Sequence, residues 1–256
     1  MTHQILVTGG TGRLGRALVP RLRAFGHTVR VLSRTAHSDP GALRGDLLTG
    51  EGLDAALDGT DTVVHCATTN GRRDTDAMRH LVEAARRCRT APHLLHVSIV
   101  GIDRIGLPYY RAKQECERML ERSGLPWTVQ RTTQFHDLVA WVYAAQRRLP
   151  VLLAPAGVSL QPVDTRDVAD RLTALVAAPP RNGRAEDMGG PEVRTARDLA
   201  RVWLRAHGGR HRPVLPVRVP GGAFRAYRAG AHLAPERAEG RITFDAYLNG
   251  RLREHS

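Results

Sequence analysis

Tyr109 and Lys113 form a Tyr-x-x-x-Lys pair that could carry acid–base chemistry. Residues four apart share one face of a helix, so a phenol and an ammonium would meet at the same place. A fixed ammonium stabilises a tyrosinate, and a phenol in that setting can serve as a general acid or base. Lys113 is also the single lysine among 38 basic residues, the others being arginines. The alternative is a solvated lysine on a helix that carries Glu115 and Glu117 as well.

Ser98 is the third residue that we expect to take part in catalysis, together with Tyr109 and Lys113. It ends an apolar run eleven residues before Tyr109. A hydroxyl at the end of a strand could donate a hydrogen bond to a substrate carbonyl while negative charge develops on its oxygen. The alternative is a serine that only bonds the backbone at a strand end.

A glycine-rich loop opens the chain at residues 8–15, with the sequence Thr-Gly-Gly-Thr-Gly-Arg-Leu-Gly. It follows an apolar strand and precedes a helical pattern, which is the setting in which G-x-G-x-x-G indicates dinucleotide binding. Glycines there let backbone N–H groups approach a pyrophosphate at the helix N-terminus. The alternative is a tight turn without a ligand. The residues expected to hold a cofactor are Gly9, Thr11, Gly12, Arg13, Leu14 and Gly15.

The end of the second strand indicates which dinucleotide would bind. An NAD site places Asp or Glu there for the ribose 2′-hydroxyl, but this strand ends in Ser33 and Arg34, and no carboxylate precedes Asp39. Two guanidinium groups, those of Arg13 and Arg34, would suit a 2′-phosphate. The sequence therefore predicts NADP(H) in preference to NAD(H). In a chain this rich in arginine, Arg34 could instead be an ordinary solvated residue.

The elements that must position these residues alternate between short apolar strands and helical patterns. Such alternation predicts an α/β fold, a Rossmann-like doubly wound parallel sheet with a small C-terminal substrate lobe. We expect a dinucleotide-binding domain over residues 1–134 and a lobe over 135–256, from which 158–178 return to the sheet domain. The expected strands are 5–8, 28–32, 43–47, 62–67, 94–100 and 127–132, and the expected helices are 13–25, 52–57, 75–89 and 110–123.

Composition excludes several classes of protein. An apolar content of 42% argues against disorder, and no apolar run approaches the length of a membrane span. Without a signal-peptide pattern at its start, and with three scattered cysteines, the chain is expected to be cytoplasmic and free of disulfides and metal. The net charge of +13 includes an acid-free stretch over residues 199–235. Without a nucleic-acid motif, we interpret that stretch as a solvated basic surface.

Together these motifs resemble the short-chain dehydrogenase/reductase superfamily, in its atypical NmrA-like NAD(P)H-binding branch, over essentially the whole chain. The resemblance implies that Tyr109 and Lys113 are the catalytic pair, that Lys113 also binds the cofactor ribose, and that Ser98 is the catalytic serine. It adds cofactor contacts from two further segments, Gly45-Asp46-Leu47 and Cys66-Ala67-Thr68, so that Asp46, Leu47, Cys66, Ala67 and Thr68 join the predicted site. The segments 124–135 and 161–168 also resemble the branch. The interval between Ser98 and Tyr109 is shorter than in the extended reductases.

The predicted function is an NADP(H)-dependent oxidoreductase that reduces a small-molecule carbonyl or similar acceptor by hydride transfer. Two alternatives stay open. The branch includes proteins that bind the cofactor and sense its redox state without catalysis, acting through a protein partner. The same scaffold could also carry a non-redox isomerase or cyclase that uses Tyr109 as an acid. Binding of nucleic acid is the least favoured interpretation.

Overall fold

The computed structural model describes residues 2–35, 39–208 and 212–254, and these form two compact units. The first unit comprises Met1–Ser98, Leu107–Arg131 and Val168–Glu186, and the second comprises Ile99–Gly106, Thr132–Asp167 and Asp187–Ser256. These bounds differ from the expected domains in three places, of which the smallest is that the second unit begins at Thr132 instead of residue 135. The segment that joins the sheet unit is Val168–Glu186, where 158–178 was expected, because its last strand pairs with the sheet. Ile99–Gly106 joins the second unit, where the N–H of Val100 donates to the carbonyl of Thr132.

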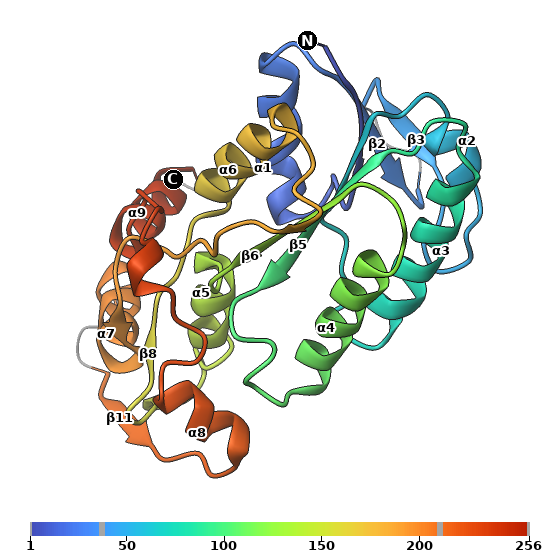
Figure 1. Cartoon of the computed structure of the whole chain (residues 1–256). Coiled ribbons are helices and arrows are strands. Elements are labelled where there is room, and N and C mark those ends of the chain that lie inside the picture. The colour runs from blue at the N-terminus through green and yellow to red at the C-terminus, as the bar shows by residue number, and fades with distance from the viewer. Residues whose placement is uncertain (1, 36–38, 209–211, 255–256) are drawn as a thin grey trace. The chain divides into compact units, whose positions relative to one another are not determined.

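The first unit is built on a seven-stranded parallel sheet in the order β3-β2-β1-β4-β5-β6-β9 (Figure 1). The chain runs outward from β1 to β3 and then returns to place β4 on the other side of β1. This reversal of strand order leaves the carboxyl ends of β1 and β4 side by side. The strands are β1 (Gln4–Thr8), β2 (Thr28–Ser33), β3 (Ala42–Arg44), β4 (Thr62–His65), β5 (His93–Ile99), β6 (Trp127–Thr132) and β9 (Gly183–Arg184).

Helices cover both faces of this sheet. In Figure 1, α1 (Arg13–Ala24) and α6 (Thr165–Ala177) lie on one face, and α2 (Leu53–Leu57), α3 (Arg73–Arg87) and α4 (Pro108–Glu121) lie on the other. Pro108 begins α4, where a proline loses no hydrogen bond and already has a helical φ. The predicted alternation of strands and helices is therefore confirmed, and the fold is a Rossmann-like parallel sheet.

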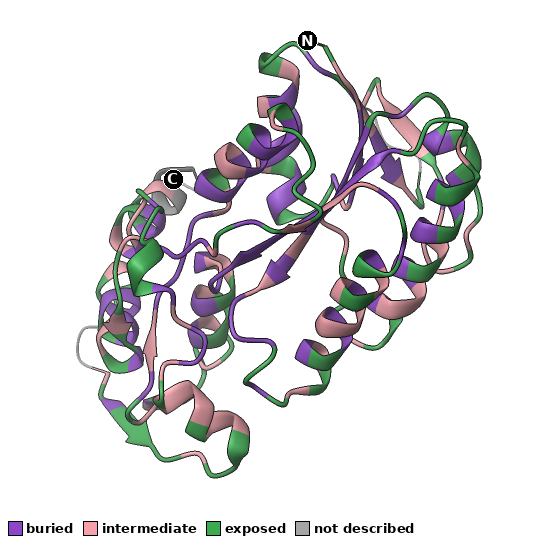
Figure 2. Cartoon of the chain, in the orientation of Figure 1, coloured by how far each residue is buried: buried purple, intermediate pink, exposed green. Residues whose placement is uncertain are grey.

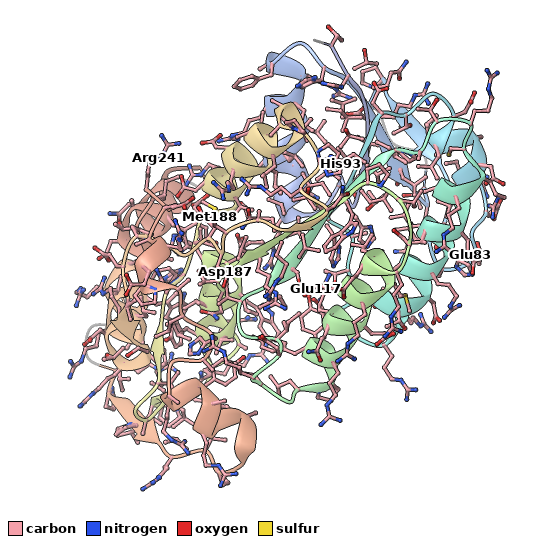
Figure 3. The ribbon with its side chains drawn as sticks, in the orientation of Figure 1. Glu83, His93, Glu117, Asp187, Met188 and Arg241 are labelled. Carbon is pink, nitrogen blue, oxygen red and sulfur yellow. The ribbon has the colours of Figure 1, made fainter. Side chains whose placement is uncertain are left out.

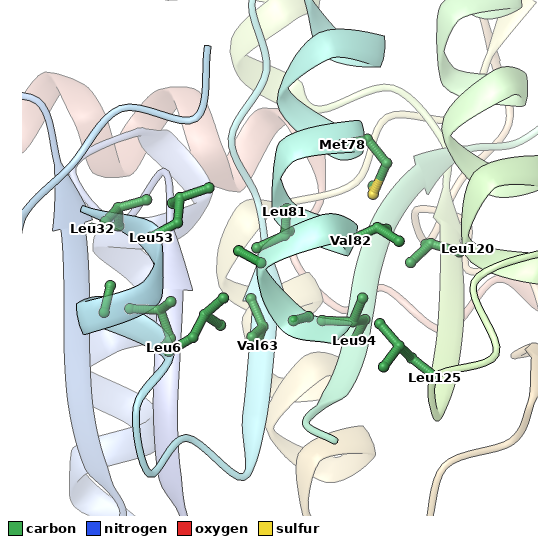
Figure 4. Close-up of a cluster of buried hydrophobic side chains, with 14 of the residues drawn as sticks. Leu6, Leu32, Leu53, Val63, Met78, Leu81, Val82, Leu94, Leu120 and Leu125 are labelled. Atoms are coloured by element: carbon green, nitrogen blue, oxygen red, sulfur yellow. The ribbon is translucent and has the colours of Figure 1, made fainter. Parts of the chain in front are cut away.

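A hydrophobic core of the first unit lies between the sheet and the helices α2, α3 and α4 (Figure 4), and α1 buries Leu18 and Leu22 as well. Leucine, valine and methionine side chains from the strands and these helices fill it, and the central strands are almost wholly buried (Figure 2). Each such side chain contributes about 1.5–3 kcal/mol when it leaves water. The core includes Leu6, Leu32, Leu53, Val63, Met78, Leu81, Val82, Leu94, Leu120 and Leu125.

The second unit has a separate core between helices and two small sheets. Tyr143, Leu152, Trp203 and Phe244 contribute to it, and the Tyr143 hydroxyl donates to the carbonyl of Ala196 at 2.7 Å. The helices are α5 (His136–Ala144), α7 (Ala196–Ala206), α8 (Gly222–Arg228), α9 (Phe244–Glu254) and the 3-10 turn η1 (Pro235–Arg237). The strands are β7 (Leu152–Pro155) paired with β11 (Val214–Val217), and β8 (Ser159–Leu160) paired with β10 (Arg194–Thr195).

Several element boundaries depart from the sequence expectation, and at two of them a side chain bonds the adjacent backbone. The third strand ends at Arg44 instead of residue 47, because Asp46 turns the chain and accepts a hydrogen bond from the N–H of Leu48 at 2.8 Å. Helix α3 begins at Arg73 instead of residue 75, because the carboxylate of Asp74 binds the preceding loop. Within the described part of the chain, no helix is long and apolar enough to cross a membrane.

Candidate cofactor and acid–base site

The glycine loop leaves the carboxyl end of β1, at the point where the strand order of the sheet reverses. Open α/β sheets bind their ligands at such a point. Gly9 has a φ of +70°, and a Cβ there would lie 2.7 Å from the Cα of Ala67 in the segment after β4. A glycine is therefore required for the two loops to pass each other. Gly15, on α1, is held as closely, because its Cβ would lie 2.3 Å from the carbonyl oxygen of Gly9.

The N-terminus of α1 has the properties of a phosphate site. Its N-cap is Gly12, no side chain caps the first turn, and that turn holds no acidic residue. Gly12 is exposed with a φ of −76°, so its backbone conformation does not require glycine. Thr11 and Arg13 are exposed beside it, and the buried Leu14 anchors the turn. The loop thus offers backbone N–H groups and the positive end of a helix to a pyrophosphate.

The residues expected at the adenosine end lie at the ends of β2 and β3. Arg34 is exposed, and the hydroxyl of Ser33 donates to the carbonyl of Thr35 at 2.8 Å. Asp46 accepts from the N–H of Leu48 in the turn after β3, and the carbonyl of Leu47 is bonded by the ring of His80 at 2.9 Å. Among the described residues at this end of β2, Ser33, Arg34 and Thr35, none carries a carboxylate, as the sequence indicates.

Tyr109 and Lys113 share a face of the first turns of α4, as their spacing predicts. The Lys113 Nζ lies 6.0 Å from the centre of the Tyr109 ring, and its side chain is 5% exposed. Tyr109 is half-buried, and its hydroxyl lies 3.3 Å from the Oγ1 of Thr68, in the loop after β4. Thr68 was expected on the cofactor side of the site, and its contact with Tyr109 joins the two groups of predicted residues.

Asp74, near the start of α3, completes this cluster and was not predicted. Its Oδ2 accepts from Thr68 Oγ1 at 2.6 Å and lies 3.5 Å from Lys113 Nζ, while its Oδ1 accepts from the N–H and hydroxyl of Thr69. Burial alone would raise the pKa of Asp74, but the charge of Lys113 and the bonds from Thr68 and Thr69 hold that pKa below its ordinary value. The sequence feature that could have pointed to Asp74 is an acidic residue in the first turn of a helix, shortly after Thr-Thr-Asn.

Below this cluster, buried polar side chains cross the sheet. Thr8, His65 and His96 are register partners on β1, β4 and β5, so they share one face. Thr8 bonds the Nδ1 of His65 at 2.7 Å, and the rings of His65 and His96 stack with their centroids 5.2 Å apart. Burial, followed by the charge of Lys113, lowers the pKa of His65 to about 3 and that of His96 well below its ordinary range. Both rings are therefore neutral at ordinary pH.

Ser98 lies two residues beyond His96 on the same strand. It is 2% exposed, and its Oγ makes no hydrogen bond among the described residues. A contact between Ser98 and the pair on α4 therefore remains a prediction. Burial raises the pKa of the Cys66 thiol, after β4, to about 12, which makes it a poor nucleophile.

The remaining candidates from the sequence have structural roles or lie on the surface. His136 begins α5 and bonds the carbonyl of Ile242 at 2.8 Å within the second core. In the basic stretch, of which residues 209–211 lie outside the described part, arginines of α7 line a surface hollow of about 590 Å³. Within the described ranges, no group of three or more His, Cys, Asp or Glu side chains is placed to hold a metal ion.

Comparison with known proteins identifies the family. A model of the family described as NAD(P)H-binding matches residues 9–179, which include the glycine loop, Asp74 and the Tyr109–Lys113 pair. The chain belongs to this NAD(P)H-binding family. Its place is among the atypical short-chain dehydrogenases/reductases, so the resemblance inferred from the motifs is confirmed.

Named relatives in this family differ in what they do. The chain is 30% identical over 213 residues to (4-alkanoyl-5-oxo-2,5-dihydrofuran-3-yl)methyl phosphate reductase of Streptomyces griseus, which covers 80% of this chain and 74% of that protein. It is 28% identical over 203 residues to the photosystem II assembly factor Ycf39 of Trieres chinensis, covering 73% of this chain and 63% of that protein. The NAD(P)H-binding family thus contains a reductase and a protein named for assembly.

Solved structures share the fold at low identity. An NADPH-dependent quinone oxidoreductase of Escherichia coli, solved with NADPH, matches with a TM-score of 0.79 and 16% identity, covering 97% of this chain and 99% of that one. A nucleoside-diphosphate-sugar epimerase of Staphylococcus aureus matches with a TM-score of 0.77 and 20% identity over the same shares. At these identities the likeness establishes the fold alone.

Proposed function

We propose that this member of the NAD(P)H-binding family is an NADP(H)-dependent reductase of a small-molecule carbonyl or similar acceptor. The observation that carries the proposal is the connected chain Tyr109–Thr68–Asp74–Lys113, which lies on the segments that follow β4 and begin α3 and α4. A site that only binds a dinucleotide needs no general acid. A phenol linked to a buried ion pair is, in addition, what proton transfer to a substrate oxygen needs.

The residues present fit a bound dinucleotide. At Gly9 and Gly15 a Cβ atom would clash with the backbone of a neighbouring segment. The first turn of α1 has no side-chain cap and no acidic residue that would compete with a pyrophosphate. Arg13 and Arg34 would hold a 2′-phosphate, and the absence of a carboxylate after β2 leaves a 2′-hydroxyl without its usual partner. The proposal therefore includes NADPH in preference to NADH, with Asp46 and Leu47 toward the adenine and Cys66, Ala67 and Thr68 beneath the cofactor.

Each residue of the acid–base group has a proposed task. When bound, NADPH would supply the hydride, with its electron pair, that the acceptor carbon takes up. Tyr109 gives its hydroxyl proton to the oxygen on which negative charge develops, and Ser98 donates a hydrogen bond to that oxygen. Lys113 has three N–H donors, of which Asp74 engages one, so the others can reach ribose hydroxyls.

The test is NADPH oxidation with a panel of quinones, conjugated lactones and simple carbonyls. For an acceptor that the wild type reduces, Tyr109→Phe is expected to lower kcat by about 10²-fold or more, because general acid catalysis contributes about 10²–10⁴-fold. Tyr227→Phe, in the second unit, serves as the matched control and keeps the wild-type rate. Full turnover by both Tyr109→Phe and Lys113→Ala would show that this mechanism is wrong.

A second candidate is an NADP(H)-responsive protein without turnover, which acts through a protein partner. It is supported by the 28% identity to a protein named as an assembly factor. This candidate predicts tight binding of the dinucleotide, no oxidation of NADPH with any acceptor, and capture of a partner in only one redox state. A non-redox isomerase is distinguished from both, because it would convert its substrate without a change in nicotinamide absorbance.

A further inference from the structure

Asp74 binds Thr68, Thr69 and Lys113 with its two carboxylate oxygens. Its side chain is 2% exposed, and both carboxylate oxygens are used, one by Thr69 and the other by Thr68 and Lys113. It also lies in the first turn of α3, where the helix dipole favours a negative charge. Asp74 is therefore held ionised and in one position.

The hydrogen bonds of this cluster determine which hydroxyl group donates to which oxygen. A threonine hydroxyl has a single proton, and that of Thr68 points to the Asp74 carboxylate at 2.6 Å. In its 3.3 Å contact with Tyr109, the Thr68 oxygen can then only accept, so Tyr109 must be the donor. The carboxylate thus acts through Thr68 to favour the protonated phenol.

The charges of the cluster cancel. Among the described residues, the other titratable groups that act on Asp74 or Lys113 are His65 and His96 from the sheet, Cys66 after β4, and Cys116 on α4. The ring of Tyr110 lies edge-on to that of Tyr109, with the centroids 6.1 Å apart. Burial keeps these imidazoles and thiols neutral at ordinary pH. Two acids of α4 also act on Cys116, and each is already paired, Glu115 with Arg118 and Glu117, labelled in Figure 3, with Arg131.

An uncompensated Lys113 would stabilise a tyrosinate, which is a base, and would suit oxidation of an alcohol. Its counter-ion, 3.5 Å away, opposes that effect. We propose that Asp74 is a positioning residue that keeps Tyr109 as the neutral phenol, so that the site is built to donate a proton and works in the direction of reduction. In that direction the Tyr109 O–H bond breaks, the substrate oxygen gains the proton, and the tyrosinate recovers a proton from water. This inference rests on the proposed function.

The direct test titrates Tyr109 without any substrate. Tyrosinate formation is followed by ultraviolet absorbance in the intact chain, and subtraction of the Tyr109→Phe trace isolates this residue among five tyrosines. In Asp74→Asn the midpoint of that titration is expected to fall by about one pH unit or more, because Lys113 loses its counter-ion. Asp76→Asn, an exposed acid of the same helix paired with Arg79, is the control and leaves the midpoint unchanged.

Three further variants protect the test against misfolding of Asp74→Asn. Lys113→Met leaves Asp74 uncompensated, so the midpoint is expected to rise, and Asp74→Asn combined with Lys113→Met restores neutrality and returns it close to the wild-type value. Thr68→Val removes the link but keeps the ion pair, and it is expected to lower the midpoint by less than Asp74→Asn does. Equal midpoints in wild type, Asp74→Asn and Lys113→Met would overturn the inference.

Measuring turnover as a function of pH distinguishes a failure of this inference from a failure of the proposed function. Where an acceptor is reduced, the alkaline limb of the rate–pH profile is expected to move down in Asp74→Asn by the same amount as the titration midpoint, while the Asp76→Asn profile stays in place. An alkaline limb that does not move would overturn the inference. If no acceptor is reduced but the titrations shift as expected, the proposed function fails and the role of Asp74 in setting the state of Tyr109 stands.

Discussion

Substituting aspartate for Gly12 should separate what the fold needs from what a phosphate needs. Gly12 is the N-cap of α1 with a φ of −76° and a ψ of 178°, a conformation that any residue can adopt. A Cβ there would meet one atom, the carbonyl oxygen of Gly9 at 3.1 Å, which requires a shift of a few tenths of an ångström. Nothing in the protein chain therefore requires a glycine at this position.

The expected effects on stability and on binding have opposite signs. An aspartate N-cap accepts a hydrogen bond from the N–H of Leu14 or Gly15 and gains a few tenths of a kcal/mol over glycine. Its charge at the N-terminus adds about 0.3–1 kcal/mol, because the first turn of α1 holds no acid. We expect Gly12→Asp to raise the free energy of unfolding by about 0.5–1 kcal/mol. The same carboxylate occupies the amides that a pyrophosphate would use and repels its charge, by up to about 4 kcal/mol at 4 Å near a surface.

The assay compares urea unfolding without ligand and NADPH binding by titration of nicotinamide fluorescence. Gly12→Asp should bind NADPH at least about tenfold more weakly, since each 1.4 kcal/mol is a factor of ten. Gly12→Asn supplies a cap without a charge, so it should gain less stability and lose less affinity. An NADPH affinity within twofold of the wild type in a stabilised Gly12→Asp would show that no phosphate lies at the start of α1.

Three further predictions concern the stability of the first unit. Gly15→Ala should lower the free energy of unfolding by about 1–3 kcal/mol in urea, because its Cβ would lie 2.3 Å from a loop carbonyl oxygen. Arg131→Met should lower the free energy of unfolding by about 3–5 kcal/mol, because it leaves the largely buried carboxylate of Glu117 without its partner. Arg118 is exposed, and Arg118→Met should change the free energy of unfolding by less than about 0.5 kcal/mol in the same assay. The pKa of the His65 imidazole is about 3 in the folded chain and about 6.5 in the unfolded chain. As the pH falls below about 6.5, the unfolded chain therefore binds a proton that the folded chain does not, and the free energy of unfolding decreases until the pH reaches about 3. The loss should approach 1.4 kcal/mol per pH unit from this one side chain, and urea unfolding at pH 7 and pH 5 should show a smaller drop in His65→Asn.

Most of the fold was predictable because β1, β2, β4, β5 and β6 are short runs rich in apolar residues, bounded by glycines or by a helical pattern. In a parallel sheet covered on both faces the strands are largely apolar, and β1, β4 and β5 have that character apart from the polar side chains that cross the sheet. β9, with the sequence Gly-Arg, carries no such pattern and was not predicted. The less accurate boundaries fall where a side chain bonds the backbone of a turn. Asp46 ends β3 early in this way, and neither periodicity nor propensity contains that information.

The site was predictable where spacing alone determines geometry. Tyr109 and Lys113 share a helix face because they are four residues apart, and the glycine loop follows its strand directly. Asp74 was missed because its partners come from other segments, 39 residues away for Lys113 and six for Thr68. Only the packing of α3 against α4 brings them together, and a sequence with many charged residues gives no sign of which acid will be buried.

The burial of Asp74 and Lys113 bears on whether the family resemblance extends to catalysis. A buried ion pair is a weak source of stability, because the loss of hydration offsets the attraction between the charges, and two apolar side chains of similar volume stabilise a core at least as well. Holding a dinucleotide would give Lys113 a use, since we propose that it reaches ribose hydroxyls, but it gives none to the buried carboxylate of Asp74, which the pyrophosphate site at the start of α1 does not need. The buried carboxylate therefore points to an effect on a neighbour. Tyr109 is that neighbour, connected to the carboxylate through Thr68 and to the ammonium across the helix face, and a controlled phenol is of use to a protein that transfers protons.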